Sequence, residues 1–134
     1  MNLMIIYMST LIPFLLIDIA MLRAVMLPLF ERNIGSLMAE DTKIGVAFGF
    51  YVFYVAGIVY FAIMPGIRYD QPSLVIINGA ILGLLAYGTY EATNMATLRG
   101  WSWQMVATDV VWGGVLTASS AYLGYLISKN LGAF

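Results

Sequence analysis

Four long apolar stretches, separated by short polar segments, dominate the sequence. They run from about residue 3 to 27, 44 to 64, 74 to 94 and 103 to 127. Each reaches the length of about 20 residues that a helix needs to cross a bilayer. None shows the period-two alternation of a membrane β-strand. The pattern therefore predicts an all-α membrane protein with four transmembrane helices.

The segments between these stretches are too short to form a separate domain. They cover residues 28–42, 65–73 and 97–102, with Pro65-Gly66 expected to stop one helix and Pro72 expected to start the next. Short links make consecutive helices antiparallel neighbours, so residues 1–134 are expected to form a single up-down bundle. The first stretch lacks a basic leader and contains Asp18, which favours a retained helix over a signal peptide.

Composition narrows the class of protein further. Hydrophobic residues make up 62% of the chain and charged residues 10%, against about 25% in a soluble domain. The net charge of −1 gives no basic surface for a nucleic acid. Cysteine and histidine are absent, which excludes disulfides, thiolate chemistry and the usual zinc and haem sites. We therefore expect no cofactor, no bound metal and no nucleic-acid partner.

The basic residues near the helix ends predict an orientation in the membrane. One side carries four and the other carries two: Arg23, Arg32, Lys43 and Arg99 against Arg68 and Lys129. The side richer in Lys and Arg is expected to be cytoplasmic. The chain is therefore predicted to be a multi-pass protein of the cell inner membrane with both termini in the periplasm.

Three carboxylic acids lie within the apolar stretches, at Asp18, Glu91 and Asp109. Asp18 is about 13 Å from the end of the first stretch, and Asp109 is about 9 Å into the fourth, at 1.5 Å per residue. With up-down threading, all three fall in the half of the membrane predicted to be cytoplasmic. Acids facing lipid are costly, so they are expected to point into the bundle.

Polar residues close to these acids extend the candidate ligand-binding site. They are Arg23, Tyr90, Thr93, Asn94 and Arg99. Carboxylate and amide oxygens suit a hard cation or an amine, whereas the arginines could hold a phosphate. The set predicts a pocket, open to the cytoplasmic side, for a cation, a lipid head group or another small polar ligand. An alternative is that each acid only forms a structural ion pair, Asp18 with Arg23 and Glu91 with Arg99.

Small and aromatic residues are open to simpler interpretations. Gly79-x-x-x-Gly83 and the stripe of Gly113, Thr117, Ser120 and Gly124 are typical of closely packed helices. Trp101 and Trp103 fall where tryptophans usually anchor a helix at the membrane surface. Trp112 is expected to face lipid or another helix, away from Asp109. Packing or an interfacial belt is favoured over a ligand site for the tyrosines of the second stretch, Tyr51, Tyr54 and Tyr60.

The segment Tyr90–Trp101 reads Tyr-Glu-Ala-Thr-Asn-Met-Ala-Thr-Leu-Arg-Gly-Trp. It resembles the signature of domain-of-unknown-function family 2177, a bacterial family of predicted membrane proteins. Matching features over nearly the whole chain are Asp18, residues 34–38, Asn78-Gly79-Ala80 and Asp109 followed by Trp112-Gly113. The chain departs from the family pattern at Glu91, where Asp is more frequent, and at Ser102, where Pro is. The resemblance implies a four-helix inner-membrane protein and, through neighbouring genes, a link to membrane lipid metabolism, but no activity.

Several functions are compatible with these features. A binding or accessory protein that contacts membrane lipids ranks first. A proton-coupled small-molecule transporter ranks second, and four helices would then require a homodimer, expected to form through the glycine-rich faces. A lipid-modifying enzyme ranks third, because no nucleophile motif, histidine cluster or nucleotide loop supports catalysis, and no catalytic residue is assigned. A structural subunit without a ligand is the remaining option.

Overall fold

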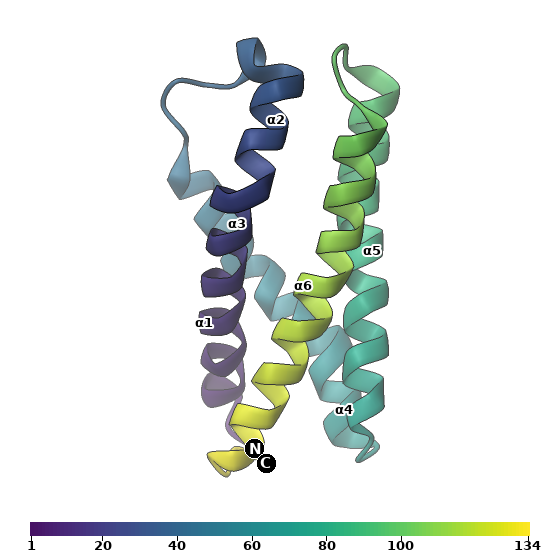
Figure 1. The fold of residues 1–134 in the computed structure, drawn as a ribbon. Helices are drawn as coiled ribbons and strands as arrows, with labels where there is room; N and C mark the ends of the chain where they lie inside the picture. The colour runs from purple at the N-terminus through teal and green to yellow at the C-terminus, as the bar shows by residue number, and fades with distance from the viewer.

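The computed structural model describes residues 1–134 as four long helical segments without strands (Figure 1). Their bounds are Leu3–Leu37, Ile44–Arg68, Pro72–Thr97 and Trp103–Asn130, and each is long and apolar enough to cross a membrane. Successive segments run in opposite directions and are joined by short links (Figure 1). The predicted fold class, an all-α membrane protein with four spanning helices in an up-down bundle, is confirmed.

The first two segments are composite helices. The first consists of α1 (Leu3–Met21), a π-helical turn η1 (Leu22–Met26), α2 (Leu27–Ile34) and a short 3₁₀ turn η2 (Gly35–Leu37). The second consists of α3 (Ile44–Ile58), a π-helical turn η3 (Val59–Ile63) and α4 (Met64–Arg68). The third and fourth segments are the single helices α5 (Pro72–Thr97) and α6 (Trp103–Asn130).

Two helix ends lie later in the chain than the sequence pattern indicated. The helix continues through Pro28 to Leu37 and through Pro65 to Arg68, so neither proline ends its helix. In each case a π-helical turn comes directly before, with Leu27 N–H bonding to the Leu22 carbonyl and Met64 N–H to the Val59 carbonyl. A proline ring normally clashes with the carbonyl four residues back. The wider π turn removes that carbonyl from its path and lets the helix continue.

Glycines bring the helices close together. A Cβ atom added at Gly83 would lie 2.1 Å from the Gly113 carbonyl oxygen, and one at Gly79 would lie 3.0 Å from the Ala118 Cα. At the crossing of α1 and α6, a Cβ at Gly124 would lie 2.1 Å from Thr10 Oγ1. Close packing is therefore confirmed as the role of these glycines. They are covered within one chain and are not available to a second copy, although a homodimer remains a prediction.

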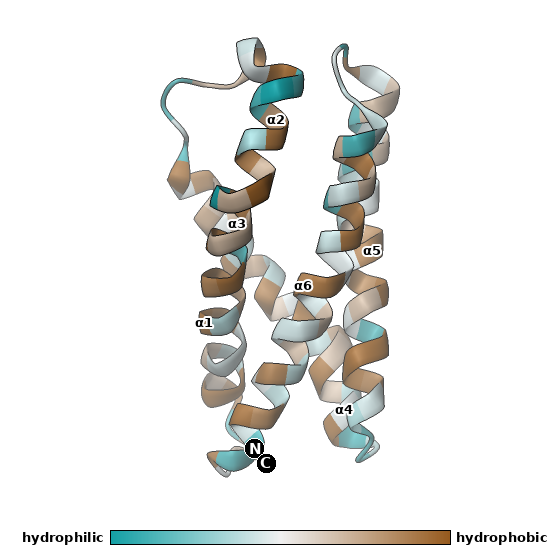
Figure 2. Cartoon of the chain, in the orientation of Figure 1, coloured by the Kyte–Doolittle hydropathy of each residue, from teal (hydrophilic) through white to brown (hydrophobic).

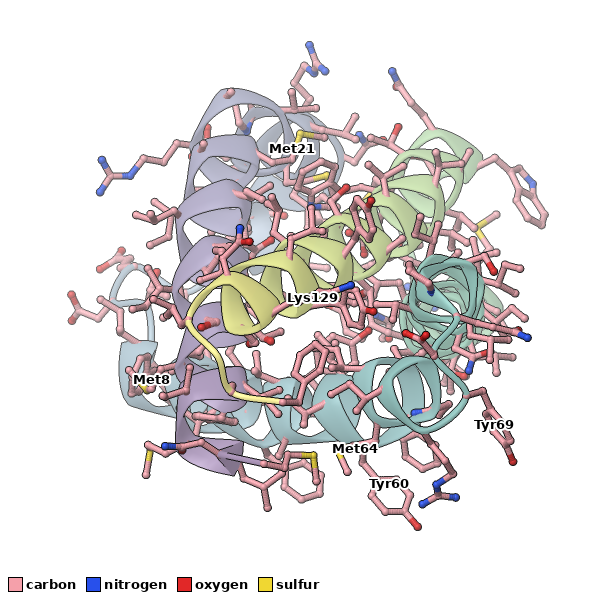
Figure 3. The ribbon with its side chains drawn as sticks, turned by 90° about the horizontal axis from the view of Figure 1, so that it is seen from below. Met8, Met21, Tyr60, Met64, Tyr69 and Lys129 are labelled. Atoms are coloured by element: carbon pink, nitrogen blue, oxygen red, sulfur yellow. The ribbon has the colours of Figure 1, made fainter.

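We call the end of the bundle with residues 38–43 and 98–102 the connector end, and the opposite end the terminal end. Both termini lie at the terminal end, where the Asn2 N–H donates to the Ala133 carbonyl at 2.7 Å (Figure 1). Seen from this end, Tyr60 and Tyr69 point away from the bundle (Figure 3). Such outward tyrosines are typical of a membrane–water interface.

The main hydrophobic core packs the terminal half of the bundle. Its fully buried members come from all four segments and include Ile6, Phe14, Ile63, Val75 and Leu116. A smaller cluster of Leu29, Trp101 and Met105 lies at the connector end. Hydrophobic residues also cover much of the outer surface along the helices, while hydrophilic ones gather towards the ends (Figure 2). An apolar exterior of this kind is compatible with lipid and not with water.

Candidate functional site

A cavity of about 600 Å³ lies in the connector half of the bundle, between the first segment, α3, α5 and α6. Thirteen of its sixteen lining residues are hydrophobic. Its charged lining residues are Asp18 from α1, Asp109 from α6, and Lys43 just before α3. The cavity is thus an apolar chamber with two acids and one base in its wall.

The start of α3 gives the cavity one of its walls. All residues from Ile44 to Phe50 are exposed, and Tyr54 and Val55 are the first buried residues of this helix. Tyr51 packs edge-on against Phe14 with ring centroids 5.4 Å apart. The first turns of α3 therefore stand beside the cavity instead of filling it.

Aromatic side chains close the inner end of the cavity. The Tyr54 hydroxyl and Thr117 Oγ1 form a hydrogen bond of 2.8 Å from α3 to α6. The Tyr54 ring contacts that of Tyr87 edge-on, with centroids 6.3 Å apart. Tyr87 in turn covers Gly113, where a Cβ would lie 2.2 Å from its Cγ. These contacts separate the cavity from the main core.

Asp18 is a buried acid in the cavity wall, with 5% of its surface exposed. Its Oδ1 is 3.5 Å from Trp112 Nε1, which can donate a long hydrogen bond. The hydroxyl of Tyr51 is also within hydrogen-bonding reach of its carboxyl group. No basic side chain is among these partners, so the carboxyl group of Asp18 is held by neutral donors alone.

Glu91 is fully buried and lies behind Asp109 rather than in the cavity wall. Trp101 Nε1 donates to Glu91 Oε1 at 3.1 Å, but Glu91 Oε2 has no donor. The carboxyl groups of Glu91 and Asp109 are within hydrogen-bonding reach of each other. Asp109 therefore connects a buried acid to the cavity.

The other residues of the predicted site are only partly brought together. Tyr90 lines the cavity with about half of its surface exposed, and its hydroxyl is within reach of the half-buried Asn94. Thr93, Arg23 and Arg99 are exposed and line no part of the cavity.

The ion-pair alternative does not hold in this structure. Asp18 is acted on by Tyr51 and Trp112, and Glu91 and Asp109 by each other, while neither Arg23 nor Arg99 acts on any of the three acids. Both arginines are on the exposed surface, whereas the acids are buried. The acids are therefore not neutralised by a basic partner from this chain.

Several residues have a role in the site that differs from the role predicted from the sequence. Trp101, expected to be an interfacial anchor, is 9% exposed and bonds to Glu91, whereas Trp103 is 71% exposed as an anchor should be. Trp112, expected to face lipid or another helix away from Asp109, lines the cavity beside Asp18. Tyr51 and Tyr54, interpreted as packing or belt residues, line the cavity as well, together with Tyr87 and Lys43.

Two spacings could have indicated some of these residues. Trp112 follows Asp109 by three residues, and Tyr54 follows Tyr51 by three, which places each pair on one helix face. Nothing in the sequence pattern indicated that Trp101 bonds to Glu91 or that Lys43 lines the cavity.

The donor set of the site is made of carboxylates, phenol hydroxyls and indole N–H groups. No group of three side chains is arranged to hold a metal ion. Buried carboxylates attract a positively charged or hydrogen-bond-donating group, and tyrosine and tryptophan faces attract a cation. The apolar remainder of the wall suits a hydrocarbon chain. The arrangement can therefore bind an amphipathic molecule with a cationic head group.

Comparison with known proteins gives one match. The family described as "Predicted membrane protein (DUF2177)" matches residues 3–126, which is almost the whole chain. Searches against curated proteins and against solved structures give no significant match.

Proposed function

The chain belongs to the DUF2177 family of predicted membrane proteins, and we propose that it is a binding or accessory protein of the cell inner membrane. Its cavity holds an amphipathic ligand, with a cationic head group against Asp18 and Asp109 and an apolar chain along the remaining wall. The single observation that carries this proposal is the pair of buried acids in a mostly apolar cavity, where Lys43, the one basic lining residue, is not among the groups that act on them.

The size and wall of the cavity support a small-molecule ligand. A volume of about 600 Å³ falls within the range of about 300–1,000 Å³ typical of such sites. Sites of this kind have mostly apolar walls with a few polar groups that fix the orientation of the ligand. Here Asp18 and Asp109 are those groups, and an ammonium head group supplies the positive charge that they lack.

The position of the cavity supports a ligand drawn from the membrane. Leu27, Val46 and Phe50 line the cavity and are exposed, so its wall continues onto the outer surface of the bundle. The first segment has 35 residues, about 52 Å at 1.5 Å per residue, against a hydrocarbon thickness of about 30 Å. Part of this segment therefore projects beyond the hydrocarbon, and Lys43 at the connector end is expected near the lipid head groups. An amine-bearing membrane lipid fits this position, which links the protein to lipid metabolism.

Binding is favoured over transport by the packing below the cavity. The Tyr54–Thr117 hydrogen bond and the fully buried Phe14 occupy the space between the cavity and the terminal end. A proton-coupled transporter would have to open this part of the bundle. A lipid-modifying enzyme ranks lower, because the wall has no serine or histidine and a pair of acids alone is weak evidence of catalysis.

Ligand binding is tested with purified protein in detergent and two probes of equal chain length, dodecylamine and dodecanol. Dodecylamine is expected to raise the unfolding temperature and to change tryptophan fluorescence through Trp112, whereas dodecanol has a smaller effect. Asp18→Asn and Asp109→Asn should each weaken amine binding by about 10- to 100-fold, because each removes a charged hydrogen-bond partner. Asp70→Asn, at an exposed acid of the terminal end, is the matched control. Equal responses to both probes, or amine binding unchanged in Asp18→Asn, would contradict the proposal.

The source of the ligand is tested by mass spectrometry of lipids that copurify with the protein. The parent chain is expected to retain an amine-bearing lipid that is depleted from Asp18→Asn and Asp109→Asn preparations. Equal lipid content in all three would exclude a lipid head group at these acids, and the amine would then come from a soluble metabolite.

The proposed orientation is tested by cysteine labelling, since the chain has no cysteine of its own. Leu131→Cys at the terminal end should react with an impermeant maleimide in intact cells. Ser36→Cys at the connector end should react only after permeabilisation; both side chains are exposed. The reverse pattern would place the cavity towards the periplasm.

A further inference from the structure

One carboxyl oxygen of Glu91 is buried and accepts no hydrogen bond. The residue is 0% exposed, its Oε1 accepts from Trp101 Nε1, and its Oε2 has no hydrogen-bond partner. A buried charged oxygen without a donor is expensive in free energy. The carboxyl group of Asp109 on α6, within hydrogen-bonding reach of Glu91, can satisfy it only if one of the two acids carries a proton.

The packing of α5 on α6 determines which residues of α6 lie beside Glu91. Gly83 lies against Gly113, and Gly79 lies four residues further from the connector end, against Thr117 and Ala118. The two helices are antiparallel, so continuing this register towards the connector end places Glu91 beside the turn that carries Met105 and Asp109. Met105 is fully buried at this contact. The glycine packing therefore brings the backbone at Glu91 to within about one turn of Asp109.

No cation acts on these two acids, since Lys43, the basic residue of the cavity wall, is not among the groups that face them. The titratable groups facing Asp109 are Asp18 from α1, Tyr51 from α3, and Tyr87, Tyr90 and Glu91 from α5. All of them are acids or neutral phenols. Two carboxylates in contact, without a neighbouring positive charge, cannot both be ionised in a site of low polarity, and one proton between them is the usual solution.

We propose that Glu91 and Asp109 share one proton when the cavity is empty, and that a cationic head group binding at Asp109 displaces this proton to water. This exchange rests on the proposed function and adds that ligand binding is coupled to the release of a proton. Before binding, the pair holds one proton and one negative charge. After binding, two carboxylates and one ammonium group carry the same net charge of −1, and the released proton has left the protein. The site thus accepts a cation without a change in its buried charge.

The shared proton is tested without any ligand, by infrared difference spectroscopy of the purified protein. A C=O stretching band of a protonated carboxyl group is expected in the parent chain and in the control Glu31→Gln, whose side chain is exposed. The band should be lost or shifted in Glu91→Gln and in Asp109→Asn, and should persist in Asp18→Asn. A band that is unchanged in either Glu91→Gln or Asp109→Asn would overturn the shared proton.

The exchange is tested by calorimetry of dodecylamine binding at neutral pH, in two buffers that differ in ionisation enthalpy. The difference in heat between the buffers counts the protons released on binding. The parent chain and Glu31→Gln should release about one proton per ligand, and Glu91→Gln should release close to none while still binding the amine. Binding without proton release in the parent would overturn the exchange and leave the proposed function standing. Absence of amine binding would overturn the proposed function together with the exchange, while the infrared band would still decide the shared proton.

Discussion

The contact between α5 and α6 at Gly83 makes a quantitative prediction. We compare Gly83→Ala with Gly88→Ala, two identical changes on the same helix. A Cβ at Gly83 would lie 2.1 Å from the Gly113 carbonyl oxygen and 2.8 Å from Thr117 Oγ1, whereas a Cβ at Gly88 would meet nothing within 4 Å. An ordinary contact needs about 3.5 Å. The helices would therefore have to part by about 1 Å, because the obstacle at Gly83 is backbone and cannot rotate away.

The expected magnitude follows from two opposing effects. Replacing a glycine by alanine inside a helix stabilises the folded state by about 0.5–1 kcal/mol, and this gain applies to both variants. Overpacking at a close helix contact costs about 1–3 kcal/mol and applies only to Gly83→Ala. The two variants should thus differ in unfolding free energy by about 2 kcal/mol, with Gly88→Ala equal to or above the parent chain.

The assay is reversible unfolding in mixed micelles with increasing SDS, followed by tryptophan fluorescence. Gly113 is about one turn from Asp109 and Thr117 about two turns, so Gly83→Ala should also weaken dodecylamine binding, whereas Gly88→Ala should not. If Gly83→Ala were as stable as Gly88→Ala, the close approach of the two helices would be refuted, and with it the placement of Glu91 beside Asp109.

Two further predictions concern hydrogen bonds in the site. Trp101→Phe removes the donor to Glu91 and should lower the unfolding free energy by about 1–3 kcal/mol. Trp103→Phe, at an exposed position, should change it by less than about 0.5 kcal/mol. Equal effects of the two substitutions would show that Trp101 does not stabilise Glu91. Tyr54→Phe should lower the unfolding free energy by about 1 kcal/mol in the same assay. Adding Thr117→Val to Tyr54→Phe should lower it little further, because the two substitutions remove the same hydrogen bond. Fully additive costs would contradict a direct contact between these two hydroxyl groups.

The number and type of the spanning helices could be predicted because apolar length is a local property of the sequence. The approximate level of the acids followed from the fixed rise of a helix and from the short links. Their closeness is a feature of the structure, in which Asp109 reaches Glu91 and shares a cavity wall with Asp18. The ends of two helices could not be placed, because a π turn that lets a helix continue through Pro28 or Pro65 leaves no recognisable pattern.

The partners of the acids could not be predicted for different reasons. Trp101 follows Gly100, whose φ of +81° turns the chain at the connector end. The turn lets Trp101 pack edge-on against Phe30 of α2, with ring centroids 5.5 Å apart, and reach Glu91. This path depends on a tertiary contact between distant segments. The inward face of α3 was equally hidden, because that helix is apolar on all sides and no charge marks which face Tyr51 and Tyr54 occupy.

The hydrogen bond between the two ends of the chain has a consequence for how the protein could be rebuilt. The Asn2 amide and the Ala133 carbonyl are 2.7 Å apart, so a few residues would suffice to join the ends covalently. A circular permutant opened in the link at residues 98–102 would begin with α6 and finish with α5, and every helix would keep its direction across the bilayer. Folding of such a permutant would show that the arrangement of the four helices does not depend on the order in which they are synthesised.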